Sequence, residues 1–425
     1  MKLLIKNIDF IFLIFLIFLT QGSLPLKIVG IFFALITRAN ALNYLHSFNL
    51  FYFTIIFYHL VYGIFCVLFE SFRYLPTYFL SLLFWMVSYI SLSQVLYFFK
   101  KNTTVKVVKT IDAFFLINVS IVLIQFIDIM YLFDSLNPYG VSTSAGDFIK
   151  SIYSNSSVNS IIMGFFAVMY LLRKKWTKGS FAVISLVMTT YMSGLVIFII
   201  SIVVSLFIFS KIKLKYKFLV IISGISMLSI FKKVSPNNVT YVSRYVNRVL
   251  ANDDNVPFKI KSFRETFEYS TSSLKSFVFG AGAGNFSSRS AFISSGDYVN
   301  WYPAFLTYAH NDFQENHLAL WNYDFRNPWD NNNNTANQPF SFYNQIIGEY
   351  GLIGILLFLI FYVGFIIKKW PKLTFTKFLL ISLVFYFVLD YWFEYFSVII
   401  IFELLVLLDI KLNSESETNI INKTH

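Results

Sequence analysis

The sequence predicts an all-α, polytopic integral membrane protein. Of its 425 residues, 57% are hydrophobic and only 13% are charged. The hydrophobic residues stand in continuous runs of roughly 20 residues, without the alternation that marks a β-barrel strand. Because hydrocarbon offers no partner to a bare backbone N–H or C=O group, each such run is expected to cross the membrane as a helix.

About twelve spans of this kind are predicted, which places both ends of the chain on the same side of the membrane. The first run follows Lys2 and Lys6 and lacks a small-residue cleavage site, so it is interpreted as an uncleaved first helix. The seventh and eighth spans also fit a single long or re-entrant element. The predicted spans are 8–21, 25–40, 48–69, 75–98, 111–133, 158–172, 179–193, 194–210, 216–231, 343–367, 374–391 and 393–409.

The net charge of +12 is concentrated in four short basic clusters between the apolar runs, and none of the four contains an acid. Such loops mark the cytoplasmic side, so the charge indicates topology and excludes a nucleic-acid partner. Cys66 is the single cysteine, which excludes a disulfide within the chain. The clusters are Lys100, Lys101, Lys106 and Lys109; Arg173, Lys174, Lys175 and Lys178; Lys211, Lys213, Lys215 and Lys217; and Lys368, Lys369, Lys372 and Lys377.

One long polar segment, 232–341, interrupts the apolar runs and is predicted to be a large extracytoplasmic (periplasmic) loop. Residues 1–231 hold the first nine spans, and residues 342–410 hold the last three. Residues 411–425 are predicted to form a cytoplasmic tail, and the polar composition of residues 413–425 predicts disorder. An Asn-rich stretch at 330–334 predicts a mobile section within the loop.

Two short amphipathic helices are predicted inside this loop, and both are suited to lie at the membrane surface. Tyr241, Tyr245 and Val249 form the apolar stripe of the first. The second is predicted to begin at Ser262, the N-cap of a capping box completed by Glu265. The face predicted for the second helix comprises Phe263, Phe267, Ser270, Leu274 and Phe277.

The arginines of the loop are the first candidates for substrate binding. Arg244, Arg248, Arg264 and Arg289 lie on the predicted outer side, where cations are less expected than in the inner loops. The planar guanidinium group binds two oxygens at once, which suits a phosphate or pyrophosphate. The alternative is a solvated helix flank, or a simple ion pair such as Arg264 with Glu268.

Histidines and aromatic residues crowd the same loop. His310 and His317 stand near Asp312 and Glu315, and an imidazole can act as a base near neutral pH. Their spacing matches no strong metal motif, so neither a metal nor a cofactor is expected. Aromatic platforms suit sugar faces and equally suit the membrane interface. The two tryptophans assigned to substrate binding are Trp301 and Trp321.

A glycine-rich turn and several acids complete the candidates. Residues 280–286 read GAGAGNF, which is neither a P-loop nor a dinucleotide-binding fingerprint and alone predicts only a tight turn. Acids within or beside spans are costly, so each is a candidate by default. These acids are Asp128, Glu349, Asp390, Glu394 and Glu403.

Three features in order resemble the O-antigen polymerase and O-antigen ligase superfamily. They are Arg264 on its amphipathic helix, the turn at 280–286, and the sequence YNQIIGEYGLIG at 343–354. The predicted topology, with one large outer loop late in the chain, is similar as well. The resemblance implies a GT-C-like fold and a metal-independent glycosyltransferase in the bacterial cytoplasmic (inner) membrane.

The resemblance also implies the reaction and its partners. Repeat units of a surface polysaccharide (O-antigen or capsule) would be polymerised from undecaprenyl-pyrophosphate-linked oligosaccharides, which serve as donor and acceptor. A chain-length regulator and a flippase are the implied protein partners. Arg264 and His310 would be catalytic, with Arg264 on the donor pyrophosphate. The implied substrate-binding residues are Arg244, Arg248, Arg289, His317, Tyr343, Glu349, Trp301 and Trp321.

The sequence departs from the family pattern at two places. The family has His-Asn shortly before the tyrosine of the last motif, where this chain has Phe340 and Ser341; the nearest His-Asn is His310-Asn311. Ser-Arg at a middle span is also missing, and Ser193-Gly194 stands there instead. Two alternatives stay open: a ligase that transfers glycan to lipid A core, and a flippase for the lipid-linked unit.

Overall fold

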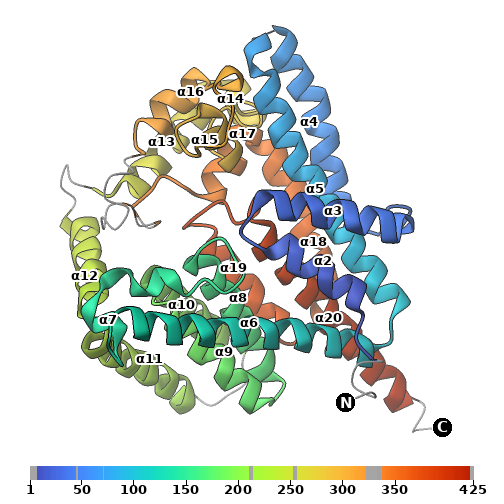
Figure 1. Cartoon of the computed structure of the whole chain (residues 1–425). Helices are drawn as coiled ribbons and strands as arrows, with labels where there is room; N and C mark the ends of the chain where they lie inside the picture. Colours follow the sequence, from blue (N-terminus) through green and yellow to red (C-terminus); the bar gives the residue numbers. More distant parts are fainter. Residues whose placement is uncertain are drawn as a thin grey trace.

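The computed structural model describes residues 7–44, 46–69, 71–209, 214–251, 256–321, 333, 335 and 337–421. Within these ranges the chain is helical and contains no β-strand (Figure 1). The Asn-rich stretch at 330–334, predicted to be mobile, lies outside the described residues except for Asn333. The all-α prediction is confirmed.

All twelve predicted spans coincide with helical segments. The predicted spans 179–193 and 194–210, which the sequence also allowed to be one element, are separate helices. Thr190 lies between the two helices in a left-handed conformation (φ 48°). The helices are α2 Phe10–Thr20, α3 Leu24–Arg38, α4 Leu50–Phe69, α5 Leu75–Lys101, α6 Thr104–Leu132, α8 Ser156–Leu172, α9 Trp176–Met188, α10 Met192–Phe209, α11 Leu214–Val234, α17 Phe342–Leu357 continued by η7 Phe358–Val363 and α18 Gly364–Lys368, α19 Thr376–Tyr386, and α20 Phe396–Ile421.

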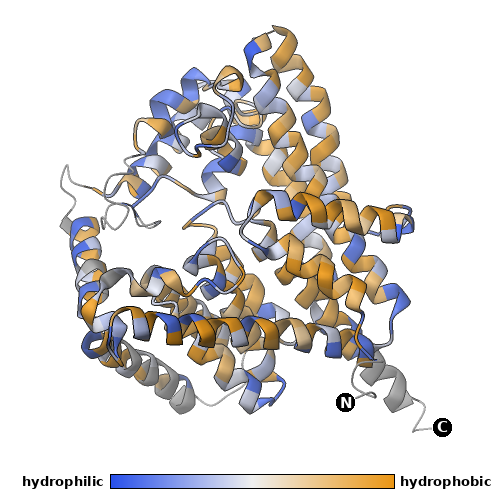
Figure 2. Cartoon of the chain, in the orientation of Figure 1, coloured by the Kyte–Doolittle hydropathy of each residue, from blue (hydrophilic) through white to orange (hydrophobic). Residues whose placement is uncertain are grey.

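Six of the described helical segments are long and apolar enough to cross a membrane, so the chain is membrane-embedded. Figure 2 shows hydrophobic residues along most of the length of α3, α4, α5 and α6. Helices α2 and α19 have 11 residues each, or roughly 16 Å at 1.5 Å per residue, against a hydrocarbon core of about 30 Å. The count of twelve crossings therefore stays a prediction. The six segments are Leu24–Ala41, Leu50–Phe69, Phe72–Lys101, Thr104–Leu132, Met192–Phe209 and Phe342–Lys368.

Side-chain contacts join several helix ends at one end of the bundle. Asp9, before α2, accepts hydrogen bonds from Arg38 at the end of α3 (2.5 Å) and from Asn102 between α5 and α6 (3.0 Å). Its backbone N–H donates to Thr110 of α6. Lys411 of α20 donates to the carbonyl oxygen of Asn102 at 2.7 Å. These contacts place Asn102, which follows the first two lysines of the first basic cluster, beside Asp9 and Lys411.

Two expectations about element boundaries are wrong. The tail predicted to be disordered continues α20 as helix to Ile421. The predicted capping box at Ser262 does not exist, because the helix begins four residues earlier, at Phe258, directly after Pro257. Proline fixes φ near the helical value and often stands at helix starts. Ser262 lies inside the helix, where its hydroxyl donates to the carbonyl oxygen of Lys259 at 2.8 Å.

The long polar segment folds into short helices. Figure 1 shows α13 to α16 gathered near α17 and α4, whereas α12 lies near α11. A small aromatic core of Phe292, Phe313, Phe340 and Tyr391 joins this group to the segment between α19 and α20. The elements are α12 Pro236–Ala251, α13 Phe258–Ser272, α14 Leu274–Val278, α15 Arg289–Ser295, η4 Ala304–Leu306, α16 Asn311–Phe313 and η5 Gln314–Leu318.

Helix α13 turns its polar side inward. Its buried residues are Lys259, Ser262, Thr266 and Ser270, whereas Phe267 is 69% exposed. The predicted apolar stripe is therefore not one helical face. Helix α13 ends at Ser272, so Leu274 and Phe277 belong to the next helix, and Phe267 is exposed together with Arg264 and Glu268.

Candidate functional site

The glycine motif forms a turn that only glycine can make. Gly280, Gly282 and Gly284 all have positive φ values, of 72°, 92° and 78°. A Cβ atom on Gly280 would lie 2.5 Å from the backbone carbonyl carbon of Glu349, and one on Gly284 would meet Thr77 at 2.5 Å. The glycines are thus needed both for the backbone conformation and for close contact with α17 and α5.

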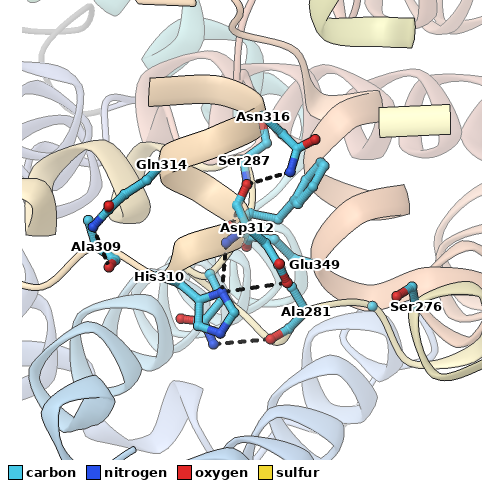
Figure 3. A network of polar contacts seen from close by, with 12 residues as sticks. Ser276, Ala281, Ser287, Ala309, His310, Asp312, Gln314, Asn316 and Glu349 are labelled. Atoms are coloured by element: carbon cyan, nitrogen blue, oxygen red, sulfur yellow. Dashed lines mark hydrogen bonds and ion pairs between the residues drawn. The ribbon is translucent and has the colours of Figure 1, made fainter. Parts of the chain in front are cut away.

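The turn wraps around the carboxylate of Glu349. One carboxylate oxygen accepts from the N–H of Gly284 (2.8 Å), and the other accepts from Phe286 (3.4 Å) and Ser287 (3.0 Å). Figure 3 shows Glu349 between Ala281 and Ser287 of this turn. Successive backbone N–H groups that converge on one anion form an anion-binding concavity, and here a side chain of the same protein fills it.

Backbone hydrogen bonds also join the turn to α17. The N–H of Ala281 donates to the carbonyl oxygen of Gly348 at 2.8 Å, and that of Gly282 donates to Glu349 at 3.0 Å. Gly351 interrupts the helical backbone at φ 57° and ψ −154°, and a Cβ atom there would lie 2.7 Å from the carbonyl carbon of Val278. The two motifs, whose contacting residues Ser287 and Glu349 are 62 apart in the chain, are therefore one structural unit.

Tyrosine hydroxyls of the helix bundle donate hydrogen bonds to carbonyl oxygens of the turn. Tyr58 and Tyr62 of α4 donate to the carbonyl oxygens of Phe279 (2.8 Å) and Gly280 (3.0 Å). Tyr74, before α5, donates to the carbonyl oxygen of Ala283 at 2.5 Å. Three carbonyl groups at the turn thus accept from tyrosines of the bundle, and three of its N–H groups donate to the Glu349 carboxylate. These bonds fix the polar segment on the membrane helices.

Arg289 and Glu394 meet next to this unit. The N–H of Arg289, the first residue of α15, donates to the Glu394 carboxylate at 2.6 Å, and Gln345 donates to the same carboxylate at 2.9 Å. The guanidinium group of Arg289 lies over the Tyr395 ring, 4.4 Å from its centroid. Its Nε atom is buried and has no hydrogen-bond partner among the described residues.

Lys259 joins three segments from the buried side of α13. Its ammonium group donates to the carbonyl oxygen of Phe340, before α17, and to that of Leu389, before α20, at 2.7 Å. Burial lowers the pKa of Lys259 to about 7, and the nearby charge of Asp390 opposes this shift. Lys259 therefore holds the start of α17 and the segment between α19 and α20 against α13.

His317 is a buried, neutral residue. Its Nε2 atom lies 3.2 Å from the hydroxyl of Thr266, and its ring packs edge-on against Phe286 at 4.7 Å. Burial, together with the charge of Lys259, lowers the pKa of His317 to about 3. The imidazole is thus uncharged at neutral pH and packs α13 against the turn.

His310 is more accessible and lies beside an acid. Its Nδ1 atom is 3.5 Å from the Asp312 carboxylate and also accepts from the backbone N–H of Asp312 at 3.2 Å. The chain just before it is attached next to the turn, since the N–H of Tyr308 donates to Ser294 at 2.8 Å and the Tyr308 ring contacts Tyr74. Figure 3 shows the contacts of His310 and Asp312 in one view with those of Glu349.

The other candidates lie farther from this unit. Arg264 is exposed on α13, and Arg244 and Arg248 are exposed on α12. Trp301 is 53% exposed, whereas Trp321 packs against Phe292 and Tyr298. Tyr343 donates from its hydroxyl to the carbonyl oxygen of Val384 at 2.8 Å. The structure thus gathers Arg289, His317 and Glu349 around the turn. His310 follows Tyr308, which is attached to Ser294 and Tyr74.

Two buried cations were missed by sequence reasoning, Lys27 on α3 and Lys259 on α13. Lys27 carried a usable signal, since it is the one charged residue within the predicted span 25–40 apart from Arg38 near its end. Lys259 carried none, because a lysine on an amphipathic surface helix is ordinarily solvated. No group of three or more metal-ligating His, Cys, Asp or Glu residues occurs among the described residues.

Fold and site together define an all-helical, membrane-embedded protein in which a polar segment is fixed onto the bundle around buried charges. Comparisons with models of protein families, with curated proteins and with solved structures found no match.

Proposed function

We propose that the protein is a membrane glycosyltransferase that polymerises undecaprenyl-pyrophosphate-linked oligosaccharide repeat units of a surface polysaccharide. The observation that supports this most is the union of the glycine turn with Glu349. It fixes a charged, histidine-containing segment directly on membrane helices. A substrate with a polar glycan and a lipid tail needs such a junction, because its reacting bond lies between the two.

The chemistry requires a cation and a base. The acceptor hydroxyl forms a bond to the anomeric carbon of the donor, and the bond from that carbon to the pyrophosphate oxygen breaks. The lipid pyrophosphate leaves with the electron pair, and a cation stabilises its developing charge. His310 takes the hydroxyl proton on Nε2. This requires Nδ1 to carry a hydrogen toward the Asp312 carboxylate, 3.5 Å away, and to give up the hydrogen bond that it accepts from the N–H of Asp312.

Arg264 is suited to the pyrophosphate by its position. It is exposed on α13, the helix whose outward face carries Phe267. With that face in lipid, Arg264 lies at the depth of phosphate groups and away from the neutralising contacts of the interior. The ligase and flippase alternatives share this geometry, so the products of the reaction must separate them.

The test is a reaction in proteoliposomes that contain the purified protein and a lipid-linked repeat unit. A polymerase yields a ladder of chain lengths and one released undecaprenyl pyrophosphate per new linkage. Transfer only after lipid A core is added would identify a ligase, and translocation without release of pyrophosphate would identify a flippase. Either of these outcomes contradicts the proposal.

Arg264→Ala is expected to slow ladder formation about 100-fold or more, the usual effect of removing one group that stabilises a developing anion. The rate is measured as undecaprenyl pyrophosphate released per minute. Lys150→Ala removes another exposed cation from the predicted outer side and serves as the control. A rate for Arg264→Ala equal to that control would remove Arg264 from the site.

His310→Ala is expected to reduce the same rate about 100-fold or more, because a positioned general base contributes at least that factor. Gln314→Ala is the matched control: it changes an exposed residue of the same segment, whose amide donates to Ala309. Full activity in His310→Ala would show that another group accepts the proton.

A further inference from the structure

Exposed apolar side chains continue from helix α4 onto helix α14 of the polar segment. Leu274 and Phe277 are exposed on α14, Leu274 to 79%, and Phe279 is exposed just after that helix. The ring of Phe279 stacks on the ring of Tyr62 of α4, with 5.5 Å between the centroids. Tyr62 in turn contacts Phe65, which is also exposed. The two helices therefore share one continuous apolar surface.

The α4 part of this surface faces lipid. Helix α4 is a candidate membrane span of 20 residues, Leu50–Phe69, and extends about 30 Å, the thickness of the hydrocarbon core of a bilayer. The whole helix is thus needed to cross the core, which places Phe69 at the boundary of the hydrocarbon on the predicted outer side. Every exposed residue of α4 is apolar, and these residues are Phe53, Phe57, Leu60, Val61, Ile64, Phe65, Leu68 and Phe69.

Hydrogen bonds fix the depth of the polar segment along α4. The hydroxyls of Tyr58 and Tyr62 donate to the carbonyl oxygens of Phe279 (2.8 Å) and Gly280 (3.0 Å). Tyr58 and Tyr62 lie about three and two turns before Phe69, roughly 16 and 10 Å along the helix axis. Long side chains of a helix lean toward its N-terminus, here away from Phe69, so the hydroxyls lie no nearer to the boundary. Figure 1 accordingly shows α14 beside the upper part of α4.

The backbone of the glycine turn is buried and paired, as this depth requires. Residues 280–288 are all buried. Three N–H groups of the turn donate to the carboxylate of Glu349, and those of Ala281 and Gly282 donate to backbone carbonyl oxygens of α17. Irregular backbone is tolerated at membrane depth only where the protein itself covers it and satisfies its polar groups. The turn meets this condition.

The residues around the start of α14 fit an entry point at the membrane surface. Residues 271–273, immediately before α14, are polar and exposed, and Lys275 is exposed as well. A lysine at this level keeps its ammonium group among the lipid headgroups while its stem covers apolar surface. The chain thus passes from a polar surface at 271–273 to the apolar surface of Leu274, Phe277 and Phe279.

We infer that residues 274–288 form a re-entrant segment, which enters the membrane beside α4 from the predicted outer side. The apolar side of α14 lies against the hydrocarbon chains of lipids in that leaflet, because it continues the lipid-facing surface of α4 without a break. Part of the segment 232–341 therefore lies below the membrane surface, whereas its composition predicts a loop wholly outside. This placement holds whether or not the protein transfers sugars.

The test measures membrane depth with nitroxide spin labels on the full-length protein in lipid nanodiscs. Cys66→Ala removes the single cysteine, and Leu274→Cys in that background carries the label. Power saturation in electron paramagnetic resonance measures collisions with oxygen, which concentrates in hydrocarbon, and with nickel ethylenediaminediacetate, which stays in water. The label at residue 274 is expected to collide several-fold more with oxygen than with the nickel complex, as does a label introduced by Phe65→Cys on α4.

Asp297→Cys, at an exposed position of the same polar segment, is the control and is expected to favour the nickel complex. Phe277→Cys gives a second label on α14, so the test survives if one variant fails to fold. Preference for the nickel complex on α14 would overturn the inference, since the helix would then face water. Low collision rates with both reagents would overturn it as well, because protein, such as a second copy of this chain, would then cover the surface.

Discussion

Replacing Glu349 with alanine is expected to destabilise the protein severely. The carboxylate accepts from three backbone N–H groups of the glycine turn, and its removal leaves all three buried without an acceptor. Each buried donor left unsatisfied costs about 1–3 kcal/mol, so the variant is expected to lose roughly 3 kcal/mol or more. The measurement is the thermal unfolding of the purified variant, with a melting temperature lower by about 3 °C or more.

Glu349→Gln is the informative companion of this variant. Glutamine keeps the shape of the side chain and one acceptor oxygen, so its loss of stability is expected to be smaller than that of alanine. If Glu349 has only a structural role, the loss of activity in each of the two variants is expected to parallel its loss of stability. A wild-type melting temperature in Glu349→Ala would contradict the anchoring role, and a stable but inactive Glu349→Gln would indicate a chemical role instead.

The helices were predictable from sequence because hydrophobic runs act locally. A run of apolar residues must form a helix in lipid wherever the rest of the chain lies, so all twelve predicted segments are helical. Boundaries that depend on capping were less predictable. Ser262 and Glu265 have the spacing of a capping box, but Pro257 starts the helix first. That the shorter segments are helical does not establish that they cross the membrane.

The site was predictable only in its parts. The glycine turn and Glu349 each stood out in the sequence, yet their contact joins residues 65 apart and is set by tertiary structure. The arginines show the same limit. Arg264 and Arg289 look equivalent in sequence, but Arg264 is exposed whereas Arg289 lies against the Tyr395 ring. How deeply a side chain is buried depends on tertiary packing, so residue type alone does not reveal which cation is buried.

Lys259 is the second residue whose replacement is expected to have a large effect, and its effect depends on pH. It is 2% exposed and donates to carbonyl oxygens on two other segments. Lys259→Met leaves those oxygens and the charge of Asp390 uncompensated, for an expected loss of about 3–5 kcal/mol. The measurement is chemical or thermal unfolding in detergent. Lys261→Met, two residues along the same helix and partly exposed, is the control and is expected to lose less than about 1 kcal/mol.

The pH dependence follows from the direction of the pKa shift. Burial lowers the pKa of Lys259 to about 7 from the ordinary 10.5, so between these values the unfolded chain binds a proton that the folded chain does not. The contribution of Lys259 to the free energy of unfolding therefore increases as the pH rises from about 7 to 10.5. The difference in unfolding free energy between wild type and Lys259→Met is expected to widen from pH 7 to pH 9. Asp390 and His317 face the same ammonium group, but the pKa of His317 is about 3, which leaves it uncharged throughout this range. A difference that stays constant or narrows over the range would show that Lys259 keeps its proton in the folded protein.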